Sequence, residues 1–127
     1  MKRRIWFMTA VFFLCAAMTV AWLVSPGAGI PVLTYHHVGE GPDWLYVRPA
    51  DFERQLVYLQ DSGYTAISVM ELSRGLSGQG ALPSRPVVIT FDDGYEDNYM
   101  AAFPTLTRQK MKGTFFFLTG KMGQPGY

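Results

Sequence analysis

The chain has 127 residues, a formal net charge of +1 and one cysteine, Cys15. Three of its 11 Lys and Arg residues lie within the first four positions, which leaves eight basic against ten acidic side chains, a balance of −2. Nucleic acid requires a basic surface, so this balance excludes nucleic acid as a partner. A single cysteine also leaves the fold without an intrachain disulfide.

Residues 1–30 are expected to direct export and to precede one folded domain at 31–127. Basic residues at positions 2–4 come before an uncharged apolar run at 5–24. A run of ~20 apolar residues can span a bilayer as a helix, whereas the apolar region of a signal peptide is nearer ~7–15. This length favours an uncleaved signal-anchor with its basic end in the cytoplasm. A cleaved signal peptide is the alternative, because the small residue Ala21 would be tolerated at a cleavage site. Both alternatives export the domain, either anchored to the membrane and facing the periplasm or cell exterior, or secreted.

Strand and helix patterns alternate through the rest of the chain. Val32 to Tyr35 predicts a strand, and a loop over 39–49 follows it. Pro49 to Ser62 predicts a helix, because Pro suits the first turn and an apolar residue recurs at i, i+4 and i+7, namely Phe52, Leu56 and Leu59. Gly63 ends this helix.

The second half continues the alternation. The patterns predict, in order, a strand over 65–68, a short helix over 70–76, a loop over 75–86, a strand over 87–91, a helix over 99–110 and a strand over 114–118. Pro104 must kink the last helix or begin a new one. Alternating strands and helices, with continuously apolar strands, predict an α/β fold with a parallel sheet.

The strand at 87–91 runs directly into two adjacent carboxylates and a glycine, Asp92, Asp93 and Gly94. Neighbouring strand residues point to opposite sides of a sheet, so the two carboxylates are suited to two different tasks. One would bind a cation and the other would handle a proton. A solvated Asp-Asp-Gly turn is the alternative, and spacing alone does not decide between them.

The hexapeptide Thr90-Phe91-Asp92-Asp93-Gly94-Tyr95 resembles the first motif of the polysaccharide deacetylases, the NodB-homology domain of carbohydrate esterase family 4. Residues 31–38 resemble the Tyr-His first strand of the branch that acts on exported poly-N-acetylglucosamine. Further segments that resemble this branch are Phe52 to Leu56, Asn98-Tyr99, Pro104 to Leu106 and Lys112 to Phe117. The resemblance covers about residues 31 to 120.

By this resemblance the fold is the N-terminal half of a distorted (β/α) barrel, preceded by one hydrophobic helix. Such barrels need ~200 residues or more. Only 97 residues follow the first 30. We therefore interpret the chain as an N-terminal fragment of a deacetylase, and half a barrel is expected to be marginally stable alone.

The resemblance also implies a reaction: metal-dependent hydrolysis of the N-acetyl amide in N-acetylglucosamine-type glycans, a non-peptide carbon–nitrogen bond. Asp93 would bind a divalent metal, expected to be Zn²⁺, and Asp92 would be the general base. A metal lowers the pKa of its bound water and polarises the carbonyl. A carboxylate committed to the metal is a poor base, which is why a second one is needed.

The rest of the implied site has no counterpart in the chain. The family's His-x-x-x-His pair is absent, and none of the 34 residues after Asp93 is a histidine. Protein zinc sites normally use three or four protein ligands, so the metal site is expected to be incomplete and the chain inactive. The alternative function is a non-catalytic, membrane-anchored remnant or a pseudoenzyme that contacts glycans.

Five aromatic or imidazole side chains remain as candidates near the site. His36 and His37 are adjacent, so at most one can face the barrel mouth. The resemblance singles out His36 as the one that could lie on the substrate side or support the site from behind, although a structural histidine is the favoured interpretation. His37 is expected to be packed or exposed, and Tyr95 to pack at the mouth, where it could lie on the substrate side or support the site from behind. Trp44 and Tyr46 could stack on sugar rings or pack on their own domain.

Overall fold

The computed structural model describes Cys15, Met18, Thr19 and residues 29–127. The signal-anchor expected at 5–24 lies almost entirely outside these residues and stays a prediction. Within the described part of the chain, no helix has the length and apolar character needed to cross a bilayer.

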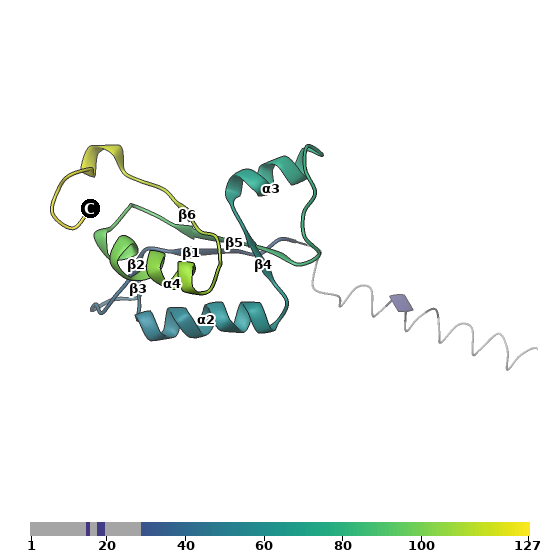
Figure 1. The fold of residues 1–127 in the computed structure, drawn as a ribbon, viewed down its shortest axis with the longest axis horizontal. Coiled ribbons are helices and arrows are strands. Elements are labelled where there is room, and N and C mark those ends of the chain that lie inside the picture. The colour runs from purple at the N-terminus through teal and green to yellow at the C-terminus, as the bar shows by residue number, and fades with distance from the viewer. Residues whose placement is uncertain (1–14, 16–17, 20–28) are drawn as a thin grey trace, which may run out of the picture.

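A four-stranded parallel sheet forms the centre of the fold (Figure 1). Its strands are β1 (Val32–Tyr35), β4 (Thr65–Ile67), β5 (Pro86–Phe91) and β6 (Thr114–Phe115). β1 pairs along one edge of β5, while β4 and β6 share the other edge, β4 along its first half and β6 along its second. The predicted α/β class and parallel sheet are confirmed.

Two short strands were not expected from the sequence. β2 (His37–Val38) and β3 (Tyr46–Val47) pair in parallel, with His37 opposite Tyr46. The segment predicted as a loop over 39–49 therefore contains β3. Two-residue strands are too short to show an alternating pattern, so only the pairing itself reveals them.

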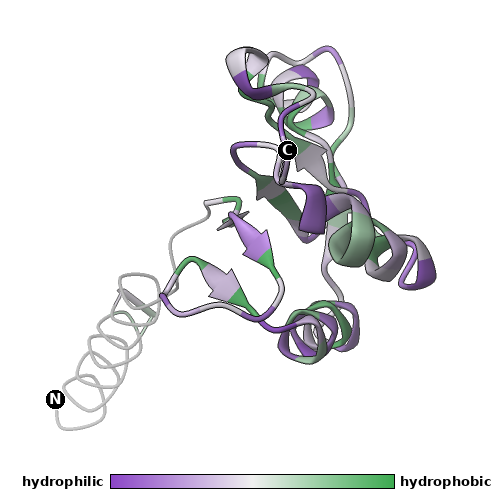
Figure 2. Ribbon diagram, turned by 90° about the vertical axis from the view of Figure 1, so that its left-hand side faces the viewer, coloured by the Kyte–Doolittle hydropathy of each residue, from purple (hydrophilic) through white to green (hydrophobic). Residues whose placement is uncertain are grey.

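α2 (Pro49–Asp61) follows β3 and matches its prediction closely. Proline occupies its first turn, and Phe52, Leu56 and Leu59 are buried. Figure 2, in which α2 is seen nearly end-on at the bottom, shows both hydrophobic and hydrophilic residues in this helix, as expected for a helix with one face against a sheet.

α3 (Val69–Leu76) begins with a reciprocal cap. The Ser68 hydroxyl accepts a hydrogen bond from the Glu71 backbone N–H, and the Glu71 carboxylate accepts one from the Ser68 N–H. Lys112 donates to the same carboxylate from the segment just before β6. The Thr114 hydroxyl of β6 accepts a hydrogen bond from the Val69 N–H over 3.2 Å, so α3 is tied to the sheet edge.

The predicted helix over 99–110 forms in two parts. A π-helical turn, η1 (Asn98–Ala102), leads into α4 (Phe103–Arg108), and the Phe103 N–H donates to the Asn98 carbonyl. Pro104 has no N–H to continue an α-helical ladder across this junction. The expected interruption at Pro104 is confirmed.

β6 is shorter than the predicted strand over 114–118. Only two residues pair with β5, and the chain then leaves the sheet toward a 3₁₀ turn, η2 (Thr119–Lys121). The Phe116 N–H still donates to the Phe91 carbonyl over 2.8 Å. The backbone of Phe116 thus stays attached to the end of β5, while the side chains of Phe116, Phe117 and Leu118 are 48%, 61% and 45% exposed.

The hydrophobic core lies between β5 and the helices on one face of the sheet. Phe91, at the end of β5, has its ring centroid 5.5 Å from that of Tyr35, 5.8 Å from Phe52 and 4.6 Å from Phe115. Thr90 points to the other face, where its hydroxyl hydrogen-bonds to that of Thr34 over 3.0 Å. β5 ends at Phe91 in this packed region, and the two carboxylates follow directly.

Candidate functional site

The acidic turn, residues 92–95, begins where β5 leaves the core. The Asp92 N–H donates to the Tyr35 carbonyl over 2.9 Å, which extends the pairing between β1 and β5 by one residue. Asp93 then adopts φ +69° and Gly94 φ +74°. This left-handed conformation costs a non-glycine residue roughly 1–2 kcal/mol of conformational free energy. Contacts with the surrounding structure must therefore stabilise Asp93 in it.

The backbone separates the two carboxylates. Thr90 and Asp92 are two residues apart and so belong to the same face of the strand, the one opposite Phe91. The left-handed backbone at Asp93 ends this alternation. Both aspartates are half-buried. The arrangement is suited to two carboxylates with separate tasks, although the assigned tasks stay predictions.

Gly94 is required at this turn for two reasons. Its φ of +74° is one that L side chains rarely adopt. A Cβ atom at this position would also lie 2.4 Å from a ring carbon of Phe117. The Phe117 ring thus packs directly against the glycine backbone.

Tyr95 links the acidic turn to two other segments. Its ring centroid lies 3.7 Å from that of His37 and 5.0 Å from that of Tyr127. A hydrogen bond with Tyr127, partial burial and a hydrogen bond with Asp93 raise the pKa of Tyr95 to about 12. Tyr95 is therefore a neutral phenol at physiological pH, packed beside the turn.

His37 lies in a cluster that sequence reasoning missed. Its Nδ1 is 2.6 Å from an oxygen of Asp97. Its ring stacks on Tyr95 on one face and on Tyr46 on the other, the latter with centroids 4.1 Å apart and planes 6° apart. One face of Tyr46 is thus occupied by His37. His37 and Asp97 are 60 residues apart, and no motif connects them in the sequence.

His36 follows Tyr35 directly and so lies beside the start of the acidic turn. Its ring makes no hydrogen bond within the described residues, and it is half-buried. The substrate-side task predicted for it stays a prediction. Trp44 is 86% exposed, so its expected stacking on a sugar ring also stays a prediction.

The described residues do not assemble a metal site by themselves. In the part of the chain that the structure describes, no three His, Cys, Asp or Glu side chains gather closely enough to hold a metal ion. Asp93 is one suitable ligand, but one carboxylate holds a transition metal weakly. The donor set therefore does not fit a complete zinc centre.

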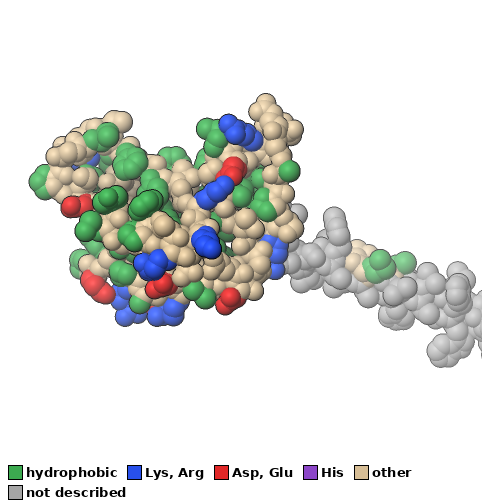
Figure 3. Space-filling view, viewed as in Figure 1, with side chains coloured by type: hydrophobic (Ala, Val, Ile, Leu, Met, Phe, Trp, Pro, Cys, Tyr) green, Lys and Arg blue, Asp and Glu red, His purple; other side chains and the backbone are tan. Residues whose placement is uncertain are grey.

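A cavity of about 340 Å³ adjoins the acidic turn. Its lining is mostly aromatic and includes Tyr95, Tyr99, Phe103, Phe115, Phe117 and Tyr127. Figure 3 shows hydrophobic side chains gathered over this end of the molecule, and Tyr99 and Phe103 are more than half exposed. Aromatic linings with few polar groups are typical of small-molecule sites.

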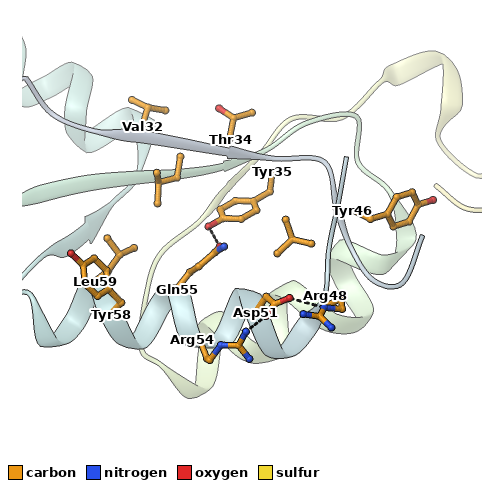
Figure 4. A pocket seen from close by; sticks show the side chains of 12 residues that line it. Val32, Thr34, Tyr35, Tyr46, Arg48, Asp51, Arg54, Gln55, Tyr58 and Leu59 are labelled. Atoms are coloured by element: carbon orange, nitrogen blue, oxygen red, sulfur yellow. Dashed lines mark hydrogen bonds and ion pairs between the residues drawn. The ribbon is translucent and has the colours of Figure 1, made fainter. Parts of the chain in front are cut away.

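A larger cavity of about 900 Å³ lies between β1 and α2 and contains neither aspartate of the turn (Figure 4). Several of its polar groups are already paired with one another. The Tyr35 hydroxyl donates to Gln55 over 2.7 Å, and Asp51 accepts from both Arg48 and Arg54. We therefore place the candidate site at the acidic turn and not in this cavity.

The sequence model of the polysaccharide deacetylase family matches residues 79–126, which include the acidic turn. YxkH of Bacillus subtilis, whose name assigns it to the polysaccharide deacetylases, is 37% identical over 106 residues, covering 83% of this chain and 38% of YxkH. The poly-beta-1,6-N-acetyl-D-glucosamine N-deacetylase of Escherichia coli K12 is 33% identical over 84 residues, which are 64% of this chain and 12% of that protein.

Solved structures show the same relationship. The Streptococcus pyogenes deacetylase PplD, solved in complex with acetate, has 33% identity and a TM-score of 0.70, covering 76% of this chain and 46% of that chain. IcaB from Ammonifex degensii has 35% identity and a TM-score of 0.69, with 76% and 41% covered. The chain thus spans less than half the length of these relatives. Sequence and fold together show that this chain belongs to the polysaccharide deacetylase family.

Proposed function

We propose that this chain supplies the acidic turn of a deacetylase that hydrolyses the N-acetyl amide of N-acetylglucosamine-type polysaccharides. The observation that carries the proposal is the pair of half-buried aspartates at the carboxyl end of β5, one of them in a left-handed backbone conformation. The carboxyl ends of parallel strands are where α/β barrels place their chemistry. The name of the similar Escherichia coli protein supports the choice of substrate.

In the proposed reaction, Asp92 is the general base. It takes a proton from a water molecule as the water oxygen forms a bond to the amide carbon. The carbon–nitrogen bond then breaks, acetate is released, and the sugar nitrogen leaves as an amine after it gains a proton. A positioned carboxylate base contributes roughly 10²–10⁴ in rate to such a step.

Asp93 is proposed as one ligand of a divalent metal, with Zn²⁺ favoured by the family resemblance. When bound, such an ion lowers the pKa of its water and polarises the carbonyl. The other ligands would have to come from outside the described residues, because these contain no cluster of three ligands.

Acetate release tests the proposal. The chain would be incubated with Zn²⁺ and oligomers of β-1,6-linked N-acetylglucosamine, beside the variants Asp92→Asn and Asp93→Asn. The incomplete ligand set leads us to expect a very low rate for the wild-type chain, and each variant should lower that rate further by at least about 10²-fold. Asp61→Asn, on the exposed end of α2, is the matched control and should stay within about twofold. If the wild-type chain releases no acetate, the catalytic proposal fails for this chain.

A non-catalytic, glycan-contacting protein is the second candidate. It is favoured by the lack of a three-ligand cluster among the described residues. Calorimetric titration with the same oligomers separates the two functions. Binding without acetate release would support the second candidate, and acetate release would exclude it.

We also propose that the chain is exported and held at the membrane through residues 5–24. The support is the basic start and the uncharged apolar run of the sequence. Membrane fractionation after export tests this: a pellet resistant to carbonate washing is expected for an anchor, and release into the medium would indicate a cleaved leader.

A further inference from the structure

His37 connects the acidic turn to the rest of the fold through a compact cluster, the histidine clamp, which consists of His37, Tyr46, Tyr95 and Asp97. We propose that His37 is a positioning residue, which holds the acidic turn in the geometry that its two aspartates need. The structural part of this proposal stands on contacts alone. Its consequence for catalysis rests on the proposed function.

One side of the histidine clamp is formed by the paired strands β2 and β3, which we call the β2–β3 mount. The His37 N–H donates to the Leu45 carbonyl over 3.2 Å, and the Gly39 N–H donates to the Val47 carbonyl over 2.9 Å. Val38, the next residue in β2, is 1% exposed and so anchors the strand in the core. The imidazole is therefore carried by backbone that is fixed on both sides.

Tyr46 completes this mount. Its ring lies nearly parallel to that of His37, with planes 6° apart. It also packs so closely on Gly41 that a Cβ atom there would lie 2.2 Å from the ring. Gly41 therefore prevents the Tyr46 side chain from rotating in its direction. The Tyr46 ring stays stacked on one face of the imidazole.

The other side of the clamp holds the acidic turn at two points. Tyr95, which follows Gly94 directly, stacks on the free face of the imidazole with centroids 3.7 Å apart. Asp97, two residues later, meets the ring edge at Nδ1 over 2.6 Å. A carboxylate only accepts hydrogen bonds, so Nδ1 carries the proton. A face contact and an edge contact together restrict both the rotation and the sliding of this segment.

Asp97 depends on His37 for its pairing. The second carboxylate oxygen of Asp97 is buried and has no hydrogen-bond partner within the described residues. Removing the imidazole would leave a half-buried carboxylate without its partner, which is costly in a protein interior. The segment after the turn would then move to hydrate the charge.

The clamp acts where the backbone most needs support. Asp93, at φ +69°, is held in a conformation that persists only when the surrounding structure imposes it. Tyr95 lies two residues after Asp93, so its stacking on His37 fixes the end of the short segment that contains Asp93 and Gly94. Contacts therefore run from the β2–β3 mount through His37 to Tyr95 and Asp97, on the segment that directly follows Asp93 and Gly94.

Native-state hydrogen exchange, followed by NMR on the full chain, tests the proposal. The reporters are the amides of Glu96 and Asn98, which donate to Gly126 and Tyr95 respectively just after the turn. In His37→Leu, we expect these two amides to exchange about tenfold faster or more, because a charged hydrogen bond and a stack are both lost. The core amides of β5, such as Ile89, should change by less than about twofold.

Two variants and one control refine this test. His37→Phe keeps a ring in the stack but loses the bond to Asp97, so it should fall between wild type and His37→Leu. His36→Leu changes the adjacent histidine, which lies outside the clamp, and should leave both reporters unchanged. If His37→Leu does not fold, Asp97→Asn keeps the side-chain volume and gives the same comparison with a smaller effect.

Unchanged reporters in His37→Leu would overturn the proposal. So would an equal rise at the reporters and at Ile89, because that would show only a loss of global stability. Acetate release provides a separate readout, with kcat expected to fall at least tenfold while KM stays within about twofold. If wild type releases no acetate, the proposed function fails, while hydrogen exchange still decides whether His37 positions the turn.

Discussion

Asp92 is joined to Tyr35 by a backbone hydrogen bond of 2.9 Å from its N–H to the Tyr35 carbonyl. Tyr35 is itself packed between Phe52 and Phe91 and hydrogen-bonds through its hydroxyl to Gln55 of α2. Burial of this phenol raises its pKa. The backbone of the first aspartate is therefore attached to a buried aromatic cluster, while the second aspartate itself adopts a left-handed backbone conformation.

Gly94→Ala should lower the free energy of unfolding by about 2–4 kcal/mol, since it combines an unfavourable φ with a clash against Phe117. Gly78→Ala is the matched control, because Gly78 has nearly the same φ, +73°, and a Cβ atom there would have no other atom within 4 Å. It should cost only about 1 kcal/mol. Urea denaturation measures both, and equal losses would show that the Phe117 contact contributes nothing.

Asn98→Leu should raise the free energy of unfolding by about 1–2 kcal/mol. Asn98 is 2% exposed, and neither its amide nitrogen nor its amide oxygen has a hydrogen-bond partner in the described part of the chain. An apolar side chain of similar shape removes this desolvation cost. Thermal and urea unfolding would measure the change. A clear loss of stability would show that the amide is paired in solution.

Leu56→Ala should lower the free energy of unfolding by about 2–5 kcal/mol, because Leu56 is a fully buried residue of α2. Val57→Ala is the neighbouring control. Val57 is 38% exposed on the other side of the same helix, and its truncation should cost less than about 1 kcal/mol. Similar losses for both variants in urea denaturation would contradict the packing of α2 described above.

Glu71 should make stability depend on pH in the acidic range. A hydrogen bond from Lys112, together with those from Ser68, lowers the pKa of Glu71 from 4.5 to about 2. A carboxyl group with a lowered pKa in the folded state stabilises the protein above its unfolded pKa, and this contribution disappears as pH falls through the folded pKa. Stability should therefore decline between about pH 4.5 and about pH 2.

Urea midpoints measured across this range for wild type and Glu71→Gln would check the pH dependence. The variant should show a shallower decline, because Gln cannot titrate. Asp61→Asn, which removes an exposed carboxylate on another helix, should leave the wild-type slope in place. Parallel curves for wild type and Glu71→Gln would show that Glu71 is not the group responsible.

Local sequence patterns predicted much of the fold. The helix at Pro49–Asp61 and the strand at Pro86–Phe91 were predicted to within one residue, because proline placement, apolar spacing and strand-forming residues all agree there. The break at Pro104 was also predicted, since a missing N–H is a property of the residue itself. β2 and β3 were missed, because two paired residues leave no periodic signal.

The candidate site likewise has a part that the sequence predicted and a part that it did not. The residues Asp92, Asp93 and Gly94 were identified from the chain, because two carboxylates and a glycine after an apolar strand form a contiguous pattern. The histidine clamp was not, because His37 and Asp97 lie 60 residues apart and no local pattern links them. Only the pairing of β1 with β5 brings the segments that carry them together.

Residue type and spacing were therefore sufficient for the α/β class, the order of the main elements, the acidic turn and the resemblance to deacetylases. These features depend on interactions between near neighbours along the chain, which the order of residues records directly. Three others became visible only in the folded molecule: Asp93 is left-handed, Gly94 lies under Phe117, and His37 rather than His36 pairs with a carboxylate. They arise from contacts between distant segments, and packing in three dimensions is what selects them.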